Sequence, residues 1–332
     1  MRKFLLHILL YSLLLITITG AIIRYIVVQI NRDENFQLKP AAANVFFGYS
    51  HVQYMIIDSL LPSSRNLGHA EEAYFYTWIK AKRILNNNPG IKTAFIEVSN
   101  KQFNYYMDSA IWADYYLRPQ LPRVLSVLDQ EELSVLFRHN PSGVLHALPD
   151  FPRQSLVAYS RKGNDVMYSR EWGGYQPLQQ NRAPEILKQI KEKGYNHDTL
   201  DNVAAEINIT YLKKLVDLCR EHHIKVWFYR SPAHPQAGYH ANEKLFRKML
   251  QAKFADIPFL DLMNLKFPVE EYYDLGHLNA TGAYRFSQFF GKVLSERLLD
   301  SSGNRQQLLT EAWKQFSPDG IGDGQIQLYT PH

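Results

Sequence analysis

The sequence predicts an α/β fold, a parallel sheet with helices on both faces, preceded by one helix in a membrane. Two observations carry this prediction. Short apolar runs of β type alternate with longer amphipathic stretches, as in sheets built from strand–helix repeats, and residues 4–23 contain no charged side chain. With 332 residues, 46% of them apolar and 21% charged, the chain is long enough for one large domain or two modest ones, and its bulk is not disordered.

Residues 1–30 have the pattern of a membrane helix. The 20 residues from Phe4 to Ile23 span about 30 Å as a helix, the thickness of a bilayer core. Arg2 and Lys3 precede this apolar run, so the positive-inside rule leaves the amino terminus in the cytoplasm and the remainder outside it. A retained signal anchor fits this pattern; a cleaved signal peptide and a buried globular helix are the alternatives.

The elements of the α/β domain follow in order from residue 44 to about residue 300, after a polar linker at residues 31–43. Pro62 and the Asn-Pro-Gly sequence at residues 88–90 end the first two predicted helices. The expected strands are residues 45–50, 93–98, 225–229 and 258–262, and the expected helices are residues 51–61, 71–85, 212–222 and 280–298.

Two segments do not fit this alternation. Residues 101–205 are rich in Tyr, Trp, Arg and Pro, and we expect them to form an insertion, either a lid over the sheet or a separate subdomain. Residues 301–332 are polar and rich in Gln and Gly, so we expect a loosely held polar tail.

Composition excludes several classes of protein and site. The single cysteine, Cys219, excludes an internal disulfide and a cysteine-based zinc site. The excess of 37 basic over 32 acidic residues is small and spread along the chain, so it does not indicate nucleic-acid binding. His222 and His223 are adjacent and diverge on a helix, which does not predict a metal site. We therefore expect no metal and no cofactor.

A serine follows the first predicted strand, in the sequence Gly48-Tyr49-Ser50-His51. A helix follows at once, and the backbone N–H groups at a helix N-terminus favour developing negative charge. Ser50 is therefore a candidate nucleophile, although an ordinary helix cap has the same pattern. His51 either contacts a substrate or simply begins the helix.

Asp274 and His277 lie in one loop directly before the last predicted helix. A serine nucleophile needs a base to take its proton, and the base needs a partner that fixes its tautomer. An Asp three residues before a His supplies both from one loop; the alternative is an Asp that caps a turn beside a structural His. His234 follows the strand at residues 225–229 and either lines the same sheet edge or belongs to a plain loop.

Two further positions follow elements that end at the carboxyl edge of the sheet, where open α/β folds place their sites. Gly68 can present a bare N–H, and Asn100 a side-chain amide. With the N–H of Ser50 they would make three donors for an oxyanion. Ordinary turn chemistry is the alternative, because Gly and Asn are turn formers.

Taken in chain order, Ser50, Gly68, Asn100 and the Asp274–His277 pair resemble the SGNH/GDSL hydrolase superfamily, and most closely its membrane-anchored bacterial members, which include relatives of polysaccharide O-acetyltransferases and esterases. The resemblance covers roughly residues 44–100 and 224–298. Its most specific part is the Asp274–His277 segment, which continues into Asn279, Gly282 and Ala283.

The resemblance implies a three-layer, flavodoxin-like α/β/α sandwich with a parallel sheet. It makes Ser50 the nucleophile, His277 the base, Asp274 its partner, and Ser50, Gly68 and Asn100 the oxyanion donors. Two blocks depart from the family pattern. Gly48-Tyr49-Ser50 replaces Gly-Asp-Ser, and Val98-Ser99-Asn100-Lys101 replaces Gly-x-Asn-Asp.

From this resemblance and the N-terminal helix we expect a serine esterase or O-acyltransferase that acts on acyl esters, such as acetyl esters of a cell-envelope polysaccharide. We expect it in the bacterial inner membrane, with its C-terminal domain on the periplasmic side. The alternatives are a non-catalytic envelope protein that keeps the fold and binds glycan or a partner enzyme, and a membrane lipid esterase or thioesterase.

Overall fold

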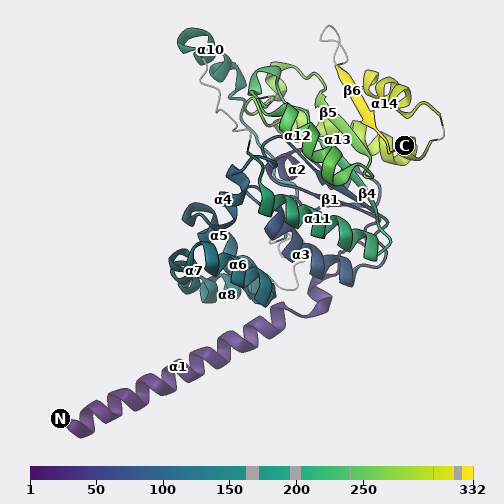
Figure 1. Cartoon of the computed structure of the whole chain (residues 1–332). Coiled ribbons are helices and arrows are strands. Elements are labelled where there is room, and N and C mark those ends of the chain that lie inside the picture. Colours follow the sequence, from purple (N-terminus) through teal and green to yellow (C-terminus); the bar gives the residue numbers. More distant parts are fainter. Residues whose placement is uncertain (162–171, 195–202, 240, 302, 318–323, 332) are drawn as a thin grey trace. The chain divides into compact units, whose positions relative to one another are not determined.

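The computed structural model describes residues 1–332 except 162–171, 195–202, 240, 302, 318–323 and 332 (Figure 1). The chain forms two compact units. One comprises Met1–Gln37 with Trp112–Glu171, and the other comprises Leu38–Ile111 with Trp172–His332. The first unit is helical and the second contains the sheet. The expected insertion therefore leaves the α/β unit after residue 111, and part of it joins the N-terminal helix in a unit of its own.

Six strands form one sheet in the order β2-β1-β3-β4-β5-β6. The first five are parallel, and β6 pairs with β5 in the antiparallel direction. The sheet is therefore mixed, and the prediction of a purely parallel sheet is wrong. The strands are β1 (Asn44–Phe47), β2 (Ser64–Asn66), β3 (Thr93–Glu97), β4 (Lys225–Arg230), β5 (Phe259–Asn264) and β6 (Gln325–Tyr329).

The antiparallel strand comes from the segment that we expected to be a loosely held tail. This segment contains α14 (Arg305–Lys314) and β6. Three of its apolar residues, Leu309, Trp313 and Ile326, are buried at 0%, 1% and 3% exposure. They belong to the same core cluster as the aromatic residues of the sheet. The polar composition of the segment reflects the exposed residues around these three anchors.

Helices lie against both faces of the sheet because alternate strand residues point to opposite faces. In α13 (Ala280–Ser295), Phe290 packs against Phe46 and Tyr229 at ring-centroid distances of 5.3 and 5.9 Å. Phe228, which directly precedes Tyr229 in β4, points to the opposite face of the sheet. Its ring packs against Phe254 of α12 (Glu243–Phe254) at a centroid distance of 5.2 Å. The α/β class predicted from the sequence is confirmed.

The predicted helices at residues 51–61, 71–85 and 212–222 form at Ser50–Met55, Tyr74–Asn87 and Glu206–Glu221, with different ends, and two further helices of the α/β unit lie within residues 101–205, where none was predicted. The first one is shorter than expected, since the side-chain amide of Asn66 donates to the carbonyls of Val52 and Ile56 at 2.8 and 2.7 Å and ends the helix there. Asn279 caps α13 by accepting from the N–H groups of Thr281 and Gly282. These helices are α2 (Ser50–Met55), α3 (Tyr74–Asn87), α4 (Tyr106–Trp112), α10 (Ala183–Lys193) and α11 (Glu206–Glu221).

In its described part, the helical unit combines the N-terminal helix with four short helices. Among the described residues, one helix is long and apolar enough to cross a membrane, residues 3–30 of α1, and a signal sequence would meet the same criteria. Asn140 caps one of the short helices by accepting from the N–H of Gly143 at 2.8 Å. The helices of this unit are α1 (Arg2–Ile30), α5 (Asp114–Val124), α6 (Gln130–His139), α7 (Pro141–Ala147) and α8 (Phe151–Arg161).

The C-terminal segment contributes to the stability of the α/β unit. The Trp313 ring packs against Phe289 and Phe267 at 5.3 and 5.1 Å. We expect Trp313→Ala to lower the free energy of unfolding by about 3–5 kcal/mol, because it removes a large buried ring and leaves a cavity. Denaturant unfolding of the purified chain measures this. The exposed neighbour variant Lys314→Ala is the control, and equal stability of the two variants would show that the segment is not part of the core.

Candidate active site

Ser50 lies at the carboxyl end of β1, where the chain turns directly into α2. The turn is tight at Gly48, which has a φ of +158°. A Cβ at this position would lie 2.3 Å from Val52 Cγ2 and 2.8 Å from Glu97 Cβ, closer than real Cβ atoms come. Glycine is therefore required there so that α2 can begin against the sheet with Ser50 in its first turn.

Ser50, His277 and Asp274 form a chain of hydrogen bonds. Ser50 Oγ lies 2.8 Å from His277 Nε2, and His277 Nδ1 lies 2.9 Å from Asp274 Oδ1. The same carboxylate oxygen accepts the backbone N–H groups of Gly276 and His277, both at 2.8 Å. The loop is thus organised around Asp274, and it holds the imidazole in the orientation that reaches Ser50.

These contacts determine the protonation of the chain. Burial acts to raise the pKa of Asp274, but the hydrogen bonds from the His277 side chain and the two backbone N–H groups outweigh it and lower that pKa. Asp274 is therefore a carboxylate, which only accepts, so His277 carries its proton on Nδ1. Nε2 is then left as the acceptor for the hydroxyl proton of Ser50.

The three predicted oxyanion donors differ in what they contact. Among the described residues, the backbone N–H of Ser50 has no acceptor, as expected in the first turn of a helix. The N–H of Gly68 donates to Asn66 Oδ1 at 2.8 Å. The amide of Asn100 donates to Glu243 Oε2 at 2.8 Å, which leaves one of its two amide hydrogens. The role of these three groups as oxyanion donors stays a prediction. The N–H of Gly68 could donate to an oxyanion only if it shared or broke its hydrogen bond to Asn66 Oδ1.

Asn100 is held by a buried ionic network at the carboxyl ends of β4 and β5. Its Oδ1 accepts from Arg230 Nη1 at 2.6 Å. Arg230 is 3% exposed and also pairs with Glu243 and Asp261, at 2.7 and 2.6 Å. Burial acts to raise the pKa of Glu243, but the hydrogen bonds and charge of Arg230, together with the bonds from Asn100 and Arg247, lower it to about 2.

His51 points into the interior rather than into solvent. It is 3% exposed, and its Nδ1 lies 3.3 Å from Oε1 of Glu97, which is fully buried. Its ring centroid is 4.9 Å from that of His277. Burial raises the pKa of Glu97 well above its usual value, and burial together with the neighbouring His277 lowers the pKa of His51. Burial therefore favours the neutral form of both partners.

The segment from Trp172 to Arg182 links the parts of this site. Gly174 N–H donates to the Gly68 carbonyl at 3.2 Å, and Gln176 N–H donates to the Gln53 carbonyl of α2 at 2.9 Å. Further along, Arg182 N–H donates to the Tyr273 carbonyl, beside Asp274, at 2.7 Å. This segment therefore joins the Gly68 loop, the helix of Ser50 and the loop of Asp274 and His277.

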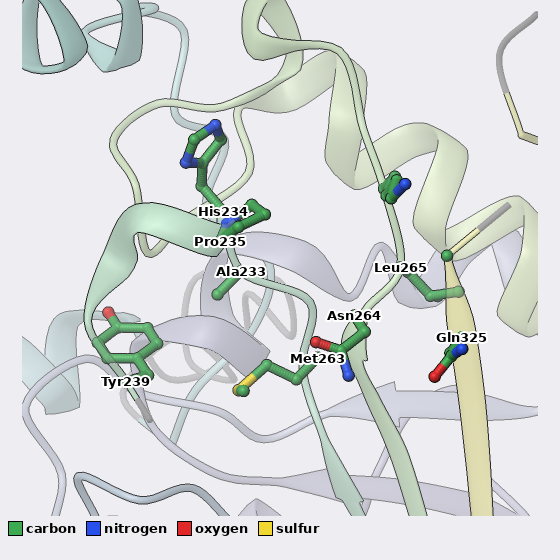
Figure 2. A pocket seen from close by; sticks show the side chains of 10 residues that line it. Ala233, His234, Pro235, Tyr239, Met263, Asn264, Leu265 and Gln325 are labelled. Atoms are coloured by element: carbon green, nitrogen blue, oxygen red, sulfur yellow. The ribbon is translucent and has the colours of Figure 1, made fainter. Parts of the chain in front are cut away.

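A pocket of about 430 Å³ lies beside the Asp274–His277 loop, at the carboxyl ends of β4 and β5. Figure 2 shows Tyr239 at one end and Gln325 at the other, with Met263 and Asn264 between them. A Cβ on Gly276 would lie 2.1 Å from the Tyr239 hydroxyl, so the loop backbone lies directly against Tyr239, which lines the pocket on this side.

His234 also lines this pocket, and its backbone N–H donates to the Leu275 carbonyl at 2.9 Å. Its Nδ1 accepts from the Gln236 N–H at 3.2 Å, so the ring proton is on Nε2, which is a donor. Burial lowers the pKa of His234. His234 is therefore a neutral donor at the pocket, and whether it contacts a substrate stays a prediction.

Several residues of the site were not predicted from the sequence. Glu97 and Arg230, which are buried, and the half-buried Glu243 form its polar support, and Tyr239 contacts the Asp274–His277 loop from the pocket side. The sequence does contain a signal for Glu97 and Arg230, because each is a charged residue inside an apolar strand, and charged residues are rarely buried unless they are paired. Glu243 and Tyr239 carry no such signal, because Glu243 begins an ordinary amphipathic helix, 13 residues from its buried partner Arg230, and Tyr239 contacts a different loop.

Comparison with known proteins gives little information about the site. A protein family without a described function matches residues 175–299, less than half of the chain. This stretch includes Asp274 and His277 but not Ser50. A search of curated proteins finds no match. Among the described residues, no group of three His, Cys, Asp or Glu side chains is placed to hold a metal ion. The functional argument therefore rests on the geometry of the site.

The network around Glu243 makes stability depend on pH. The pKa of Glu243 falls from its usual 4.5 to about 2 on folding, so its contribution is complete above about pH 4.5 and is lost as the pH falls towards 2. We expect Glu243→Gln to have a shallower loss of stability over this range than the wild type. Denaturant unfolding at a series of pH values measures it. The exposed Glu221→Gln is the control, and wild-type pH dependence in Glu243→Gln would contradict the assignment.

Proposed function

We propose that this protein is a serine esterase or O-acyltransferase of the SGNH type. The observation that carries the proposal is the hydrogen-bonded chain from Ser50 through His277 to Asp274, with the serine in the first turn of a helix. A protein that only binds glycan has no need to hold a serine hydroxyl 2.8 Å from an imidazole that is itself oriented by a carboxylate. The non-catalytic alternative is thereby disfavoured.

The proposed reaction begins when Ser50 Oγ attacks the carbonyl carbon of an acyl ester while His277 Nε2 takes its proton. The carbonyl oxygen becomes an oxyanion, which the unpaired N–H of Ser50 stabilises together with the donors predicted at Gly68 and Asn100. His277 then protonates the leaving alcohol. The acyl-enzyme is resolved by water, which makes an esterase, or by a sugar hydroxyl, which makes a transferase.

The electrostatic surroundings suit this chemistry. Asp274 remains a carboxylate and stabilises the imidazolium that forms on His277. The neighbouring ring of His51, 4.9 Å away, is kept neutral because burial lowers its pKa, and burial raises the pKa of its partner Glu97. Because His51 carries no charge, it does not repel the positive charge that His277 gains in the first step.

The pocket beside the Asp274–His277 loop is the proposed site for the alcohol part of the ester. Its polar lining includes the Nε2–H of His234 and the amides of Asn264 and Gln325, and Tyr239 supplies an aromatic face. Donors and a tyrosine ring fit a carbohydrate, whose hydroxyls accept hydrogen bonds and whose C–H face packs on rings. We propose an acylated cell-envelope polysaccharide, with acetyl as the acyl group.

The N-terminal helix supports a place at the membrane. Residues 3–30 have the length and composition of a membrane span. With Arg2 and Lys3 at its start, the positive-inside rule places the remainder of the chain on the periplasmic side of a bacterial inner membrane. An enzyme anchored there has access to envelope polysaccharide.

Labelling with a fluorophosphonate tests the nucleophile without knowledge of the substrate, because it reports an activated serine. We expect one adduct per wild-type chain by intact mass, at Ser50 by peptide mapping, and no adduct in Ser50→Ala. The control Ser142→Ala removes an exposed serine and should label as the wild type does. A folded wild-type protein that forms no adduct would favour the glycan-binding alternative.

We expect the carboxylate of Asp274 to contribute separately to the rate at which Ser50 is labelled. In Asp274→Asn the amide can no longer fix the proton on Nδ1, so His277 loses the tautomer that accepts from Ser50. We expect the rate of fluorophosphonate labelling to fall by about 10³–10⁴-fold while Ser50 remains the labelled residue. The surface variant Asp256→Asn should keep the wild-type rate. A wild-type rate in Asp274→Asn would mean that the carboxylate has only a structural role.

A further inference from the structure

The helical unit exposes large apolar side chains. Outside α1, most of the exposed large apolar side chains among the described residues belong to this unit, although it is the smaller of the two. Four are aliphatic and come from a short stretch of α7, α8 and the turn between them. They are Leu145 (56% exposed), Leu148 (36%), Leu156 (56%) and Val157 (37%). We call these four residues the 145–157 surface. Such a concentration marks an interaction site.

Part of this surface lies beside α1. The ring of Tyr159 in α8 packs edge-on against Tyr25 of α1 at a centroid distance of 6.4 Å. Leu156 precedes Tyr159 by three residues and therefore lies on the same side of α8, one turn earlier. Leu156 is thus next to the segment of α1 that enters the unit, and Val157 follows it on the adjacent side of α8.

The helix α1 has an exposed part and a partly buried part, which meet near the contact between Tyr25 and Tyr159. Every residue from Phe4 to Ile22 is exposed, whereas Ile26 and Ile30 are buried at 7% and 6% exposure. The exposed part measures about 30 Å along the helix, which matches the hydrocarbon core of a bilayer. Tyr25 then falls at the level of the lipid headgroups, where tyrosine is enriched, and α8 lies at the same level because Tyr159 touches Tyr25.

We propose that the 145–157 surface inserts into the outer face of the membrane beside α1. An interfacial helix buries its apolar side chains at the boundary of headgroups and acyl chains and keeps basic residues at the phosphates. Arg153 fits this pattern, because it is exposed on α8 one turn before Leu156 and Val157. The occupant of the surface is therefore the lipid bilayer, and the inference rests on the proposed membrane anchoring of α1.

Depth-dependent quenching in proteoliposomes tests this in the full chain. Leu145→Cys and Leu156→Cys carry a bimane label, and the vesicles of phosphatidylethanolamine and phosphatidylglycerol contain a lipid with a spin label near the headgroup. Cys219 is buried, and the unlabelled parent chain verifies that it does not react. Leu14→Cys in α1 reports the span, and Ser134→Cys, exposed on α6 of the same unit, is the matched control.

We expect the spin-labelled lipid to reduce the fluorescence at positions 145 and 156 by about twofold or more, as for an interfacial helix, with no reduction at 134. Deep spin labels should quench position 14. If position 14 is quenched while 145 and 156 behave like 134, the 145–157 surface faces water and the proposal is wrong, although the anchor stands. If position 14 is not quenched either, both the anchor and the proposal are wrong.

Discussion

The hydrogen bond between Ser50 Oγ and His277 Nε2 joins residues that are 227 positions apart. It forms because both loops leave the same carboxyl edge of the sheet. The missing side chain of Gly48 leaves room for Val52 of α2 and for Glu97 of β3, which sets the position of Ser50. Asp274 gathers two backbone N–H groups and the imidazole, which sets the position of His277. The proposed chemistry depends on both, and neither loop alone has a functional geometry.

The hydrogen bond between Ser50 and His277 lies near charged side chains that are buried at the edge of the sheet. Glu97 and Arg230 are buried at 0% and 3% exposure, where charged residues are rare unless paired. Arg230 lies among the carboxylates of Glu243 and Asp261, whereas burial raises the pKa of Glu97 beside His51. The two surroundings differ because Arg230 lies within hydrogen-bond distance of two carboxylates, whereas in the described part of the chain the side chain of Glu97 has a hydrogen bond only to the imidazole of His51, at 3.3 Å. The result is a rigid support for Asn100 on one side and an uncharged neighbour for His277 on the other.

The proposed membrane attachment and the proposed chemistry belong to different units of the chain. The proposed anchor and the exposed 145–157 surface belong to the helical unit, and the Ser50–His277–Asp274 chain belongs to the α/β unit. A unit that is held by a membrane-spanning helix and by an interfacial surface has a more fixed orientation at the membrane than a unit held by one spanning helix. The reason is that a single helix can rotate about its own axis. The segment from Trp172 to Arg182 carries the chain from the helical unit back across the loops of the site.

The sequence by itself determined the apolar N-terminal helix, the α/β class and the positions of most strands, because these depend on local hydrophobic pattern and on turn residues such as Pro62. It also identified Ser50, Asp274 and His277 as candidates, since an Asp three residues before a His has a chemical meaning at short range. Only the tertiary structure decided that Ser50 lies 2.8 Å from His277, that Gly68 and Asn100 already have hydrogen-bond partners, and that His51 is buried against Glu97. It also decided that the polar C-terminal segment adds an antiparallel strand. Each of these depends on contacts between residues far apart in the chain, and a local pattern contains no information about which distant partner a polar group or a strand edge will meet.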